Sequence, residues 1–378
     1  MKPHEIDIAI GMERYYYEDW NEINATIERP NGFKVIEEID FRSAEEWRGD
    51  RVGKYIVYLL TKKGIDHFSM LAEIQKVLRK KVNYLGIKDA NAITEQLVYI
   101  IKEGDENSII QEYNTENISL RFLGFSPKKL NHTGNIFEIT LITSDFDIIK
   151  ERLRDISKDP YIPAYIGYQR FGSRRPITHI VGKYLLKRDW ERAFYYILTY
   201  PFLSESDEIR SVRKLIVNNE FKEALRLLPS KFKQEKTLIK NYLKFGNYYL
   251  ALKNSFIPIS LYLDAYQSYI FNLYLSRKLD EYRKLAEKDN VNVIIPTYYD
   301  NCDELCKQIY LEEGIERNFF NIKEFKVSLR TLIRKAFMKV RNIKINEKTN
   351  TISFTLDRGM YATVVLREIL KGDPRKFT

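Results

Sequence analysis

The sequence of 378 residues is poor in cysteine and histidine and has no long apolar run. Its two cysteines, Cys302 and Cys306, are too few for a disulfide framework, and a zinc site would need about four ligands. We interpret both as ordinary helix cysteines. No window approaches the roughly 20 consecutive apolar residues of a membrane helix, and no cationic start followed by an apolar core marks a secretory signal. These absences predict a cytoplasmic protein with no metal site and no membrane span.

Several common catalytic motifs are absent as well. The chain contains no G-x-x-x-x-G-K-[ST] phosphate loop, no G-x-G-x-x-G after a strand, no H-E-x-x-H and no G-x-S-x-G. The four histidines are scattered, and no order of Ser, His and Asp stands out. Any acid–base or nucleophilic chemistry should therefore depend on a carboxylate, a lysine or a tyrosine.

What the sequence does have is positive charge and aromatic residues. Lys and Arg number 62 against 52 Asp and Glu, which gives a net charge of +10, and there are 27 Tyr and 21 Phe. Such a chain can neutralise phosphates and stack on bases. The alternative is a basic protein that binds no anion and whose aromatic residues only fill the core. Composition alone leaves both open.

The length exceeds the about 100–200 residues of an ordinary domain, so we expect two domains. Residues 33–143 contain strand patterns and one helix, over 67–80, which Asp66 can cap. Helical periodicity dominates 189–311, and strands return at 340–345 and 351–356 before a closing helix at 363–370. Strands on both sides of a helical block predict an α+β fold with a mainly helical inserted domain. The other expected elements are strands at 33–39, 52–60, 82–85, 93–101, 118–124 and 136–143 and a helix at 145–157.

One loop between two of these strands is a candidate functional segment. Asp89 lies in the polar loop 86–91, three residues after Gly86. Because two strands hold such a loop, its carboxylate is a rigid group that a ligand can reach. The alternative is a turn aspartate whose side chain bonds its own backbone.

The segment around this aspartate resembles the signature of TruD-type pseudouridine synthases, G-x-K-D-(x)-x-A-x-T-x-Q. The matching residues are Gly86, Lys88, Asp89, Ala92, Thr94 and Gln96. Four more blocks resemble motifs of the family in the same order: G-N-x-F at 134–137, Y-F-G-x-Q-R-F-G at 165–172, S-x-L-F-N at 268–272 and G-S-Y-A-T-x-x-x-R-E at 359–368. The ordered set covers most of the chain.

This resemblance implies a fold and an activity. The fold would be a mixed or antiparallel central sheet of the pseudouridine synthase type, with a catalytic domain at 1–160 and 326–378 and an inserted, mainly helical TRUD domain at 161–325. The family isomerises uridine to pseudouridine in RNA, and position 13 of tRNA is its usual target. We therefore expect an enzyme without cofactor or metal, whose partner is tRNA, which works as a monomer and binds RNA between its two domains.

The resemblance also assigns site residues. Asp89 would be the catalytic carboxylate, either as a nucleophile at C1′ or as a base toward the sugar. Such a charge in a desolvated pocket needs a compensating cation, which Lys88, Arg29 or Arg170 would provide. Arg29 is a hypothesis, because the family usually has a lysine shortly before P-x-D-F and this chain reads I-E-R-P-N-G-F at 27–33.

Other residues of the matching blocks are expected to contact the substrate. Phe137 would lie against the target base, Asn135 beside it would read the uracil edge, and Gln169 would contribute a further contact. The basic residues expected at phosphates, with a solvated surface as the alternative for each, are Lys128, Lys129, Arg174 and Arg175.

The chain departs from the family pattern at Ala164 and Ile166, where the family has Asn and Phe, which suggests a divergent member. Two rival functions stay open. The first is an inactive RNA-binding protein on the same fold. The second is a metal-dependent ribonuclease, which would need two or three clustered carboxylates, whereas Asp89 has no acidic neighbour before Glu95.

Overall fold

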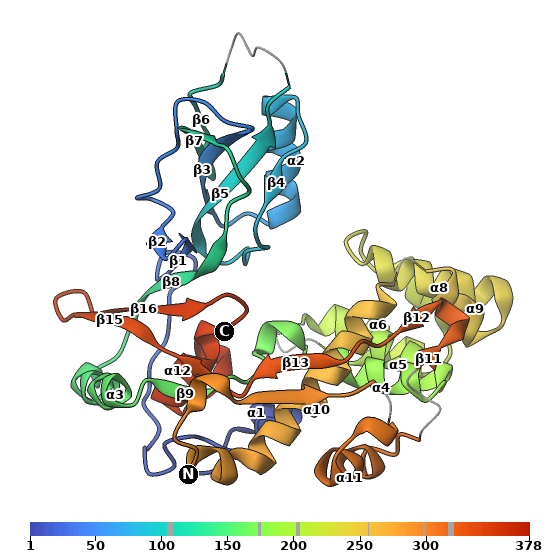
Figure 1. Cartoon of the computed structure of the whole chain (residues 1–378). Coiled ribbons are helices and arrows are strands. Elements are labelled where there is room, and N and C mark those ends of the chain that lie inside the picture. Colours follow the sequence, from blue (N-terminus) through green and yellow to red (C-terminus); the bar gives the residue numbers. More distant parts are fainter. Residues whose placement is uncertain (104–108, 173–174, 202–204, 256, 298, 317–320) are drawn as a thin grey trace.

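The computed structural model describes residues 1–103, 109–172, 175–201, 205–255, 257–297, 299–316 and 321–378. Within these ranges a sheet of ten strands forms the centre of the molecule (Figure 1). Its strand order is β15-β16-β8-β1-β5-β3-β7-β6, with β2 beside β1 and β4 beside β5. Strands β1 and β5 run parallel and the other neighbouring pairs are antiparallel, so the predicted mixed sheet is confirmed. The strands are β1 (Phe33–Ile39), β2 (Arg42–Ser43), β3 (Tyr55–Lys63), β4 (Asn83–Tyr84), β5 (Ile93–Ile101), β6 (Glu112–Asn114), β7 (Ile118–Ser126), β8 (His132–Thr140), β15 (Arg341–Asn346) and β16 (Thr351–Asp357).

Strand β3 is buried on both faces, which explains its continuous apolar run. Ile56 and Leu60 pack in one cluster with α2 (His67–Leu78), whereas Val57 and Leu59 pack in a second cluster on the opposite face. The helix begins where the sequence predicts it. Asp66 Oδ1 accepts hydrogen bonds from the N–H groups of the second and third helical residues, at 3.1 and 3.0 Å, and so caps the helix.

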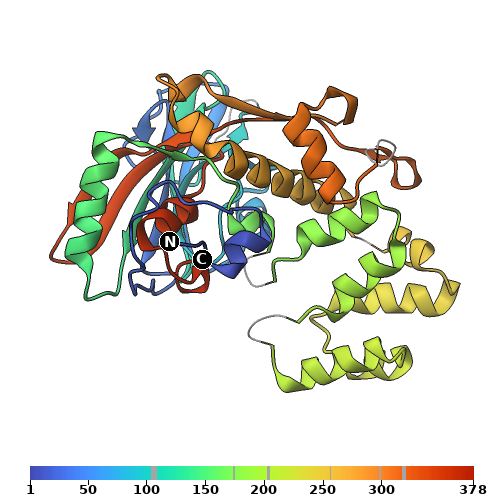
Figure 2. The same cartoon turned by 90° about the horizontal axis from the view of Figure 1, so that it is seen from below.

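The middle of the chain is helical, as predicted. Helices α4–α9 extend to one side of the sheet, and the long helix α10 packs against α4 (Figures 1 and 2). None of the helices in the described ranges has the length and apolar character needed to cross a membrane. The helices of this segment are α4 (Thr178–Leu186), α5 (Trp190–Thr199), α6 (Asp207–Val217), α7 (Phe221–Leu227), α8 (Lys233–Phe245), α9 (Tyr248–Lys253), α10 (Ile259–Arg283) and α11 (Glu304–Glu312).

The C-terminal strands return to the central sheet. Strands β15 and β16 form the predicted hairpin, and β16 pairs with β8 so that Phe354 lies opposite Phe137. Two short pairs connect the sheet region to the helical segment: β9 (Tyr161–Pro163) with β14 (Phe337–Lys339), and β10 (Asn292–Ile295) with β13 (Leu332–Lys335). Strand β13 follows the domain boundary expected at 325, whereas its partner β10 precedes it. The domain division stays a prediction. The chain closes with α12 (Ala362–Leu370), near the predicted bounds.

The two cysteines are an exception to the sequence interpretation. Cys302 precedes the cap residue of α11 and is joined by a disulfide to Cys306 in the first turn of that helix, so the interpretation as two ordinary helix cysteines is wrong.

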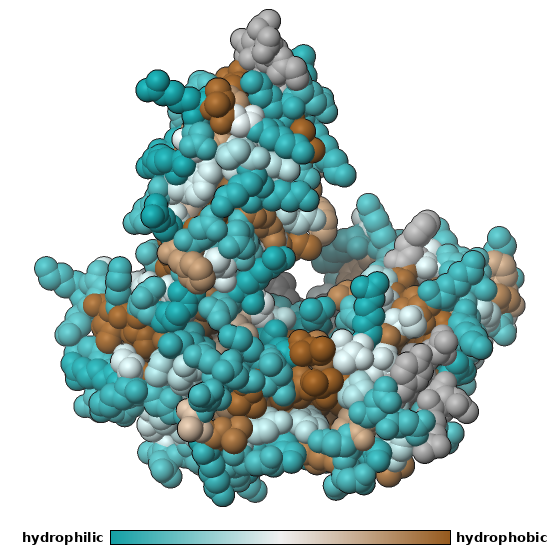
Figure 3. Space-filling model, in the orientation of Figure 1, coloured by the Kyte–Doolittle hydropathy of each residue, from teal (hydrophilic) through white to brown (hydrophobic). Residues whose placement is uncertain are grey.

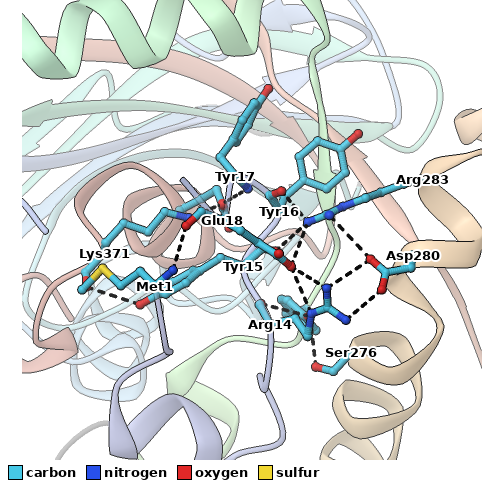
Figure 4. A network of polar contacts seen from close by, with 12 residues as sticks. Met1, Arg14, Tyr15, Tyr16, Tyr17, Glu18, Ser276, Asp280, Arg283 and Lys371 are labelled. Atoms are coloured by element: carbon cyan, nitrogen blue, oxygen red, sulfur yellow. Dashed lines mark hydrogen bonds and ion pairs between the residues drawn. The ribbon is translucent and has the colours of Figure 1, made fainter. Parts of the chain in front are cut away.

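The N-terminal segment ties α10 to α12 through a polar network (Figure 4). Arg14 Nη1 lies 3.0 Å from Asp280 Oδ2 of α10, and Arg14 Nη2 lies 2.5 Å from Glu18 Oε1. Arg283 also faces Glu18, at 3.6 Å. At the other end, the Tyr15 hydroxyl donates a hydrogen bond to the carbonyl oxygen that follows α12. The network fixes α12, whose first residues border the site described below.

The amide of Asn272, in the 268–272 block, has a structural role. Its Nδ2 donates to the carbonyl oxygens of Ile10 (2.9 Å) and Ile166 (3.0 Å), and its Oδ1 accepts from the N–H of Ile166 at 2.8 Å. A fully buried side chain on α10 thus holds the backbone of the 165–172 block in place.

His179 on α4 makes the stability of the fold sensitive to acid. Its ring packs between Phe171 and Tyr269, and burial lowers its pKa to about 3. The unfolded chain, with a pKa of about 6.5, takes up the proton first as the pH falls, so the free energy of unfolding decreases below about pH 6.5. Between pH 7 and pH 5, the free energy of unfolding of His179→Phe should therefore fall by about 2 kcal/mol less than that of wild type. Urea unfolding at both pH values measures this, and equal losses in both proteins would refute it.

Candidate active site

Asp89 lies in the loop between β4 and β5. The sequence left open whether it is a turn aspartate or an accessible carboxylate, and its side chain has features of both. Its Oδ1 accepts a hydrogen bond from the N–H of Asn91 at 3.1 Å, which is the turn contact. Its Oδ2 lies 3.6 Å from Arg29 Nη1, and the side chain is 40% exposed. The turn therefore orients the carboxylate, while one oxygen stays available beside a cation.

Arg29 is the cation that the structure places at Asp89. Its Nη1 also donates to the carbonyl oxygen of Asn91 (3.0 Å), and its Nη2 donates to that of Phe377 (3.2 Å). The guanidinium carbon lies 4.0 Å from the centre of the Phe33 ring. Burial lowers the pKa of Arg29, which the charge of Asp89 partly offsets. An arginine stays charged under these conditions, so Arg29 connects the loop of Asp89 to the C-terminus as a fixed positive charge.

Lys88 is paired with Glu37 and not with Asp89 among the ion pairs of the described residues. Its Nζ lies 2.8 Å from Glu37 Oε1 and 3.0 Å from Asn135 Oδ1. Glu37 is fully buried. His132 Nε2 also approaches Asn135 Oδ1, at 3.3 Å, and burial lowers the pKa of this histidine. Because Lys88 donates to the amide oxygen, the amide of Asn135 is oriented with its NH₂ group as the free end.

Lys62 on β3 is a site residue that sequence reasoning missed. It is 0% exposed, and its Nζ donates to the backbone carbonyl oxygens of Asp89 (2.5 Å) and Ile65 (3.0 Å). Burial lowers its pKa, and the charge of Asp89 acts in the opposite direction. The strand predicted from the sequence ended at residue 60, so Lys62 was not expected to contact the loop of Asp89. The available signal was a lysine that continues a buried strand, because a buried charge needs a partner.

Asp89, Lys88 and Asn135 line a cleft with a volume of about 390 Å³. The surface is hollowed between the module of β3–β7 and the helical segment (Figure 3). Phe137 is 7% exposed, and its ring lies 6.2 Å from Phe33 and 5.7 Å from Phe354. It is thus a core residue that also forms the wall of the cleft. The lining residues are Phe33, Val35, Ile87, Lys88, Asp89, Asn135, Phe137, Gln169, Met360, Tyr361, Ala362 and Thr363.

The structure places Gln169 at the cleft and Arg170 beside it. Gln169 is exposed, and its Oε1 accepts a hydrogen bond from the Thr363 hydroxyl at 3.3 Å. Arg170 faces Arg334, whose pKa is lowered by burial and further by the charge of Arg170. In the described part of the chain, Arg170 forms no ion pair with Asp89, so Arg29 is the nearer of the expected cations.

The residues expected at phosphates lie in different environments. Lys128 and Lys129 are exposed in the loop between β7 and β8. Arg175 points inward: its Nη2 donates to the carbonyl oxygens of Tyr196, at 2.8 Å, and Ile197, and burial lowers its pKa to about 10. Its phosphate role therefore finds no support, since the guanidinium group holds the end of α5. Arg174 lies outside the described residues.

No group of three or more His, Cys, Asp or Glu side chains in the described ranges is arranged to hold a metal ion. Glu95 is the next acidic residue after Asp89 in the sequence. Glu95, on β5, pairs with Lys34 at 2.9 Å, and burial raises the pKa of Glu95 to about 7.

Comparisons with known proteins agree along the whole chain. A family model described as tRNA pseudouridine synthase D (TruD) matches residues 9–301 and 295–369. A Saccharolobus solfataricus protein described as "Probable tRNA pseudouridine synthase D" is 69% identical over 378 residues, which are 100% of both chains. A Sulfurisphaera tokodaii protein with the same description is 48% identical, over 98% of this chain and 100% of the relative. The crystal structure of a Methanosarcina mazei protein, described as a TruD protein, is similar in fold, with a TM-score of 0.76 over 100% of both chains at 23% identity.

Proposed function

Because this chain belongs to the TruD family and is a tRNA pseudouridine synthase, we propose that it isomerises the uridine at position 13 of tRNA, with Asp89 as the catalytic carboxylate and without a cofactor. The observation that supports this most is the position of Asp89. One of its oxygens lies 3.6 Å from Arg29 at the edge of a cleft that Phe137 and Asn135 also line.

The reaction breaks the C–N glycosidic bond of uridine, rotates the uracil and joins its C5 to the ribose. Asp89 either attacks C1′ or takes a proton from the sugar, and both roles require the ionised carboxylate. Arg29 places a fixed positive charge 3.6 Å from one carboxylate oxygen, where it can attract the negative charge that both roles use. The hydrogen bond from Asn91 keeps the carboxylate oriented while it works.

The cleft supplies the groups that would hold a uracil during rotation. The target nucleotide must leave the RNA stack to reach Asp89. Phe137 offers a ring for stacking, which is worth about 1–3 kcal/mol per base. Asn135 donates its NH₂ group to a uracil carbonyl, because Lys88 occupies its amide oxygen. Gln169, on the 165–172 block, also lines the cleft and contributes a polar contact to the nucleotide.

Phosphates of the tRNA bind at exposed basic residues near the sheet. Lys128 and Lys129 are the candidates that the structure leaves accessible. Each neutralised phosphate releases counterions, so tRNA affinity should fall steeply with salt.

The activity is tested by single-turnover release of tritium from tRNA that contains 5-³H-uridine. We expect wild type to release tritium equally with and without EDTA, to leave the RNA intact, and to release none when the nucleotide at position 13 is cytidine. Failure to release tritium while binding tRNA would identify an inactive binding protein. RNA cleavage that EDTA abolishes would identify a metal-dependent nuclease.

A further inference from the structure

Phe41 is an exposed aromatic residue in an unfavourable backbone conformation. Asp40 and Phe41 form the two-residue turn between β1 and β2, with φ of 47° and 62°. A turn with two positive φ values favours Asn-Gly, and a bulky residue there is an outlier. The Phe41 side chain is nevertheless 72% exposed, so core packing does not explain it.

We propose that Phe41 is a stacking site for a nucleobase of tRNA outside the catalytic cleft. This inference rests on the proposed function and extends it, because it assigns a second base contact. An aromatic ring held in solvent is the type of group on which unpaired bases stack. Backbone strain at an exposed position is typical of functional sites, where it fixes a side chain in the orientation needed.

The turn is held rigidly by its surroundings. The N–H of Asp40 donates to the carbonyl oxygen of Asn131 at 3.0 Å, and Asn131 Nδ2 donates back to Asp40 Oδ1 at 3.1 Å. The N–H of Phe41 donates to the Thr133 hydroxyl at 3.1 Å. The ring is therefore presented by a fixed turn, so little conformational entropy is lost when a base stacks on it.

Positive charge near the turn fits RNA. The guanidinium carbon of Arg341 lies 6.0 Å from the centre of the Phe41 ring, although Glu38 and Asp357 share its charge. Arg42, the next residue, is exposed. The loop that contains Lys128 and Lys129 ends at Asn131, which bonds the turn.

The turn also lies in line with the cleft. Phe33 and Val35 of β1 line the cleft, Glu37 holds Lys88 at its border, and Phe41 follows the end of the same strand. At about 3.3 Å per residue, Phe41 lies at most roughly 20 Å along the chain from Val35. Unpaired nucleotides next to the target uridine can cover this distance.

A protein partner is the rival occupant, and the surface argues against it. In the view of Figure 3, the area over β1 and β2 shows a small apolar spot within a hydrophilic surface. A protein interface of standard size needs an apolar centre with contributions from many residues. A single ring surrounded by charged side chains is the size of one base.

The test uses the full-length protein and tRNA. Phe41→Gly and Phe41→Asn remove the ring and suit the positive φ, so both should fold with an unchanged or higher Tm. We expect them to raise Kd and KM for tRNA by roughly 5- to 100-fold while kcat stays within about twofold of wild type. Phe41→Trp keeps a stacking surface and should bind within about threefold of wild type. Leu311→Ala, an exposed apolar residue of α11 that is 64% exposed, is the matched control and should change nothing.

A direct readout identifies the base. 2-Aminopurine is placed, one position at a time, in the unpaired nucleotides around the target. One position should lose fluorescence on binding wild type and Phe41→Trp, but not Phe41→Gly. If Phe41→Gly and Phe41→Asn both bind tRNA with an unchanged Kd, the proposal is overturned and the protein partner is favoured. A loss confined to kcat would also overturn the proposal, because a base contact outside the cleft should act on binding. If wild type does not isomerise uridine, the proposed function fails. If wild type isomerises uridine and the Phe41 variants bind and react as wild type does, this inference alone fails.

Discussion

Asp89→Asn should abolish isomerisation and leave tRNA binding within a few-fold of wild type. An amide is neither a useful nucleophile nor a base at neutral pH, so the chemical rate should fall by at least roughly 10³-fold. The substitution should not disturb the loop. The amide oxygen can still accept the hydrogen bond from Asn91, and Arg29 keeps its bonds to the carbonyl oxygens of Asn91 and Phe377. Lys62 donates to the backbone carbonyl oxygen of residue 89, which the substitution keeps.

The experiment compares two aspartates. Single-turnover tritium release measures the chemical step, and filter binding measures the tRNA complex. Asp145→Asn is the matched control, because Asp145 precedes α3 (Phe146–Lys158) and its side chain makes no cap hydrogen bond. We expect the control to react as wild type. An Asp89→Asn protein that isomerises near the wild-type rate would show that another group performs the chemistry.

Much of the fold was predictable because the relevant signals are local. The bounds expected for β1 and β5 agree with the structure, since alternation and β-branched residues determine such strands. The start of α2 followed from the capping chemistry of Asp66. Helix α4 was missed because it has no side-chain cap and contains Gly182. A Cβ at Gly182 would overlap the backbone of Tyr262, so close packing against α10 requires a residue that weakens the local helix signal.

The site was predictable only in part, because its geometry is tertiary. The family resemblance assigned Asp89, but it left three cations as candidates for its partner: Lys88, Arg29 and Arg170. Arg29 reaches it because β1 and β5 pair in parallel, with Lys34 opposite Ile93. That register brings together segments about 60 residues apart, and no local pattern encodes it. The contacts of Arg175 were unpredictable for a similar reason, since its partners are backbone carbonyl oxygens of α5, about 20 residues further along the chain.

The largest effect after Asp89 is expected at Arg29. Arg29→Met should reduce the chemical rate by roughly 10²-fold, as loss of one preorganised charge does in other active sites. It removes the only charge that faces Asp89 at this distance among the described residues, and two bonds that hold the loop to the C-terminus. Arg29→Lys should recover most of the lost rate, because it restores a cation; it should stay below wild type, because an ammonium group cannot bind both carbonyl oxygens and stack on Phe33 as a planar guanidinium does.

Lys88→Met separates this role from general damage to the site. Lys88 neutralises the fully buried Glu37, so its loss leaves an unpaired buried charge and should lower the free energy of unfolding by about 3–5 kcal/mol. Arg29→Met leaves Asp89 without its cation and two backbone carbonyl oxygens without a donor. The only charge that it leaves without a partner is 40% exposed and can be solvated, so thermal stability should change less than in Lys88→Met. Single-turnover rates and thermal unfolding of the three variants measure both effects. If Arg29→Met and Arg29→Lys lose the rate equally, positive charge at this position is not what the carboxylate needs, and Arg29 only holds the loop.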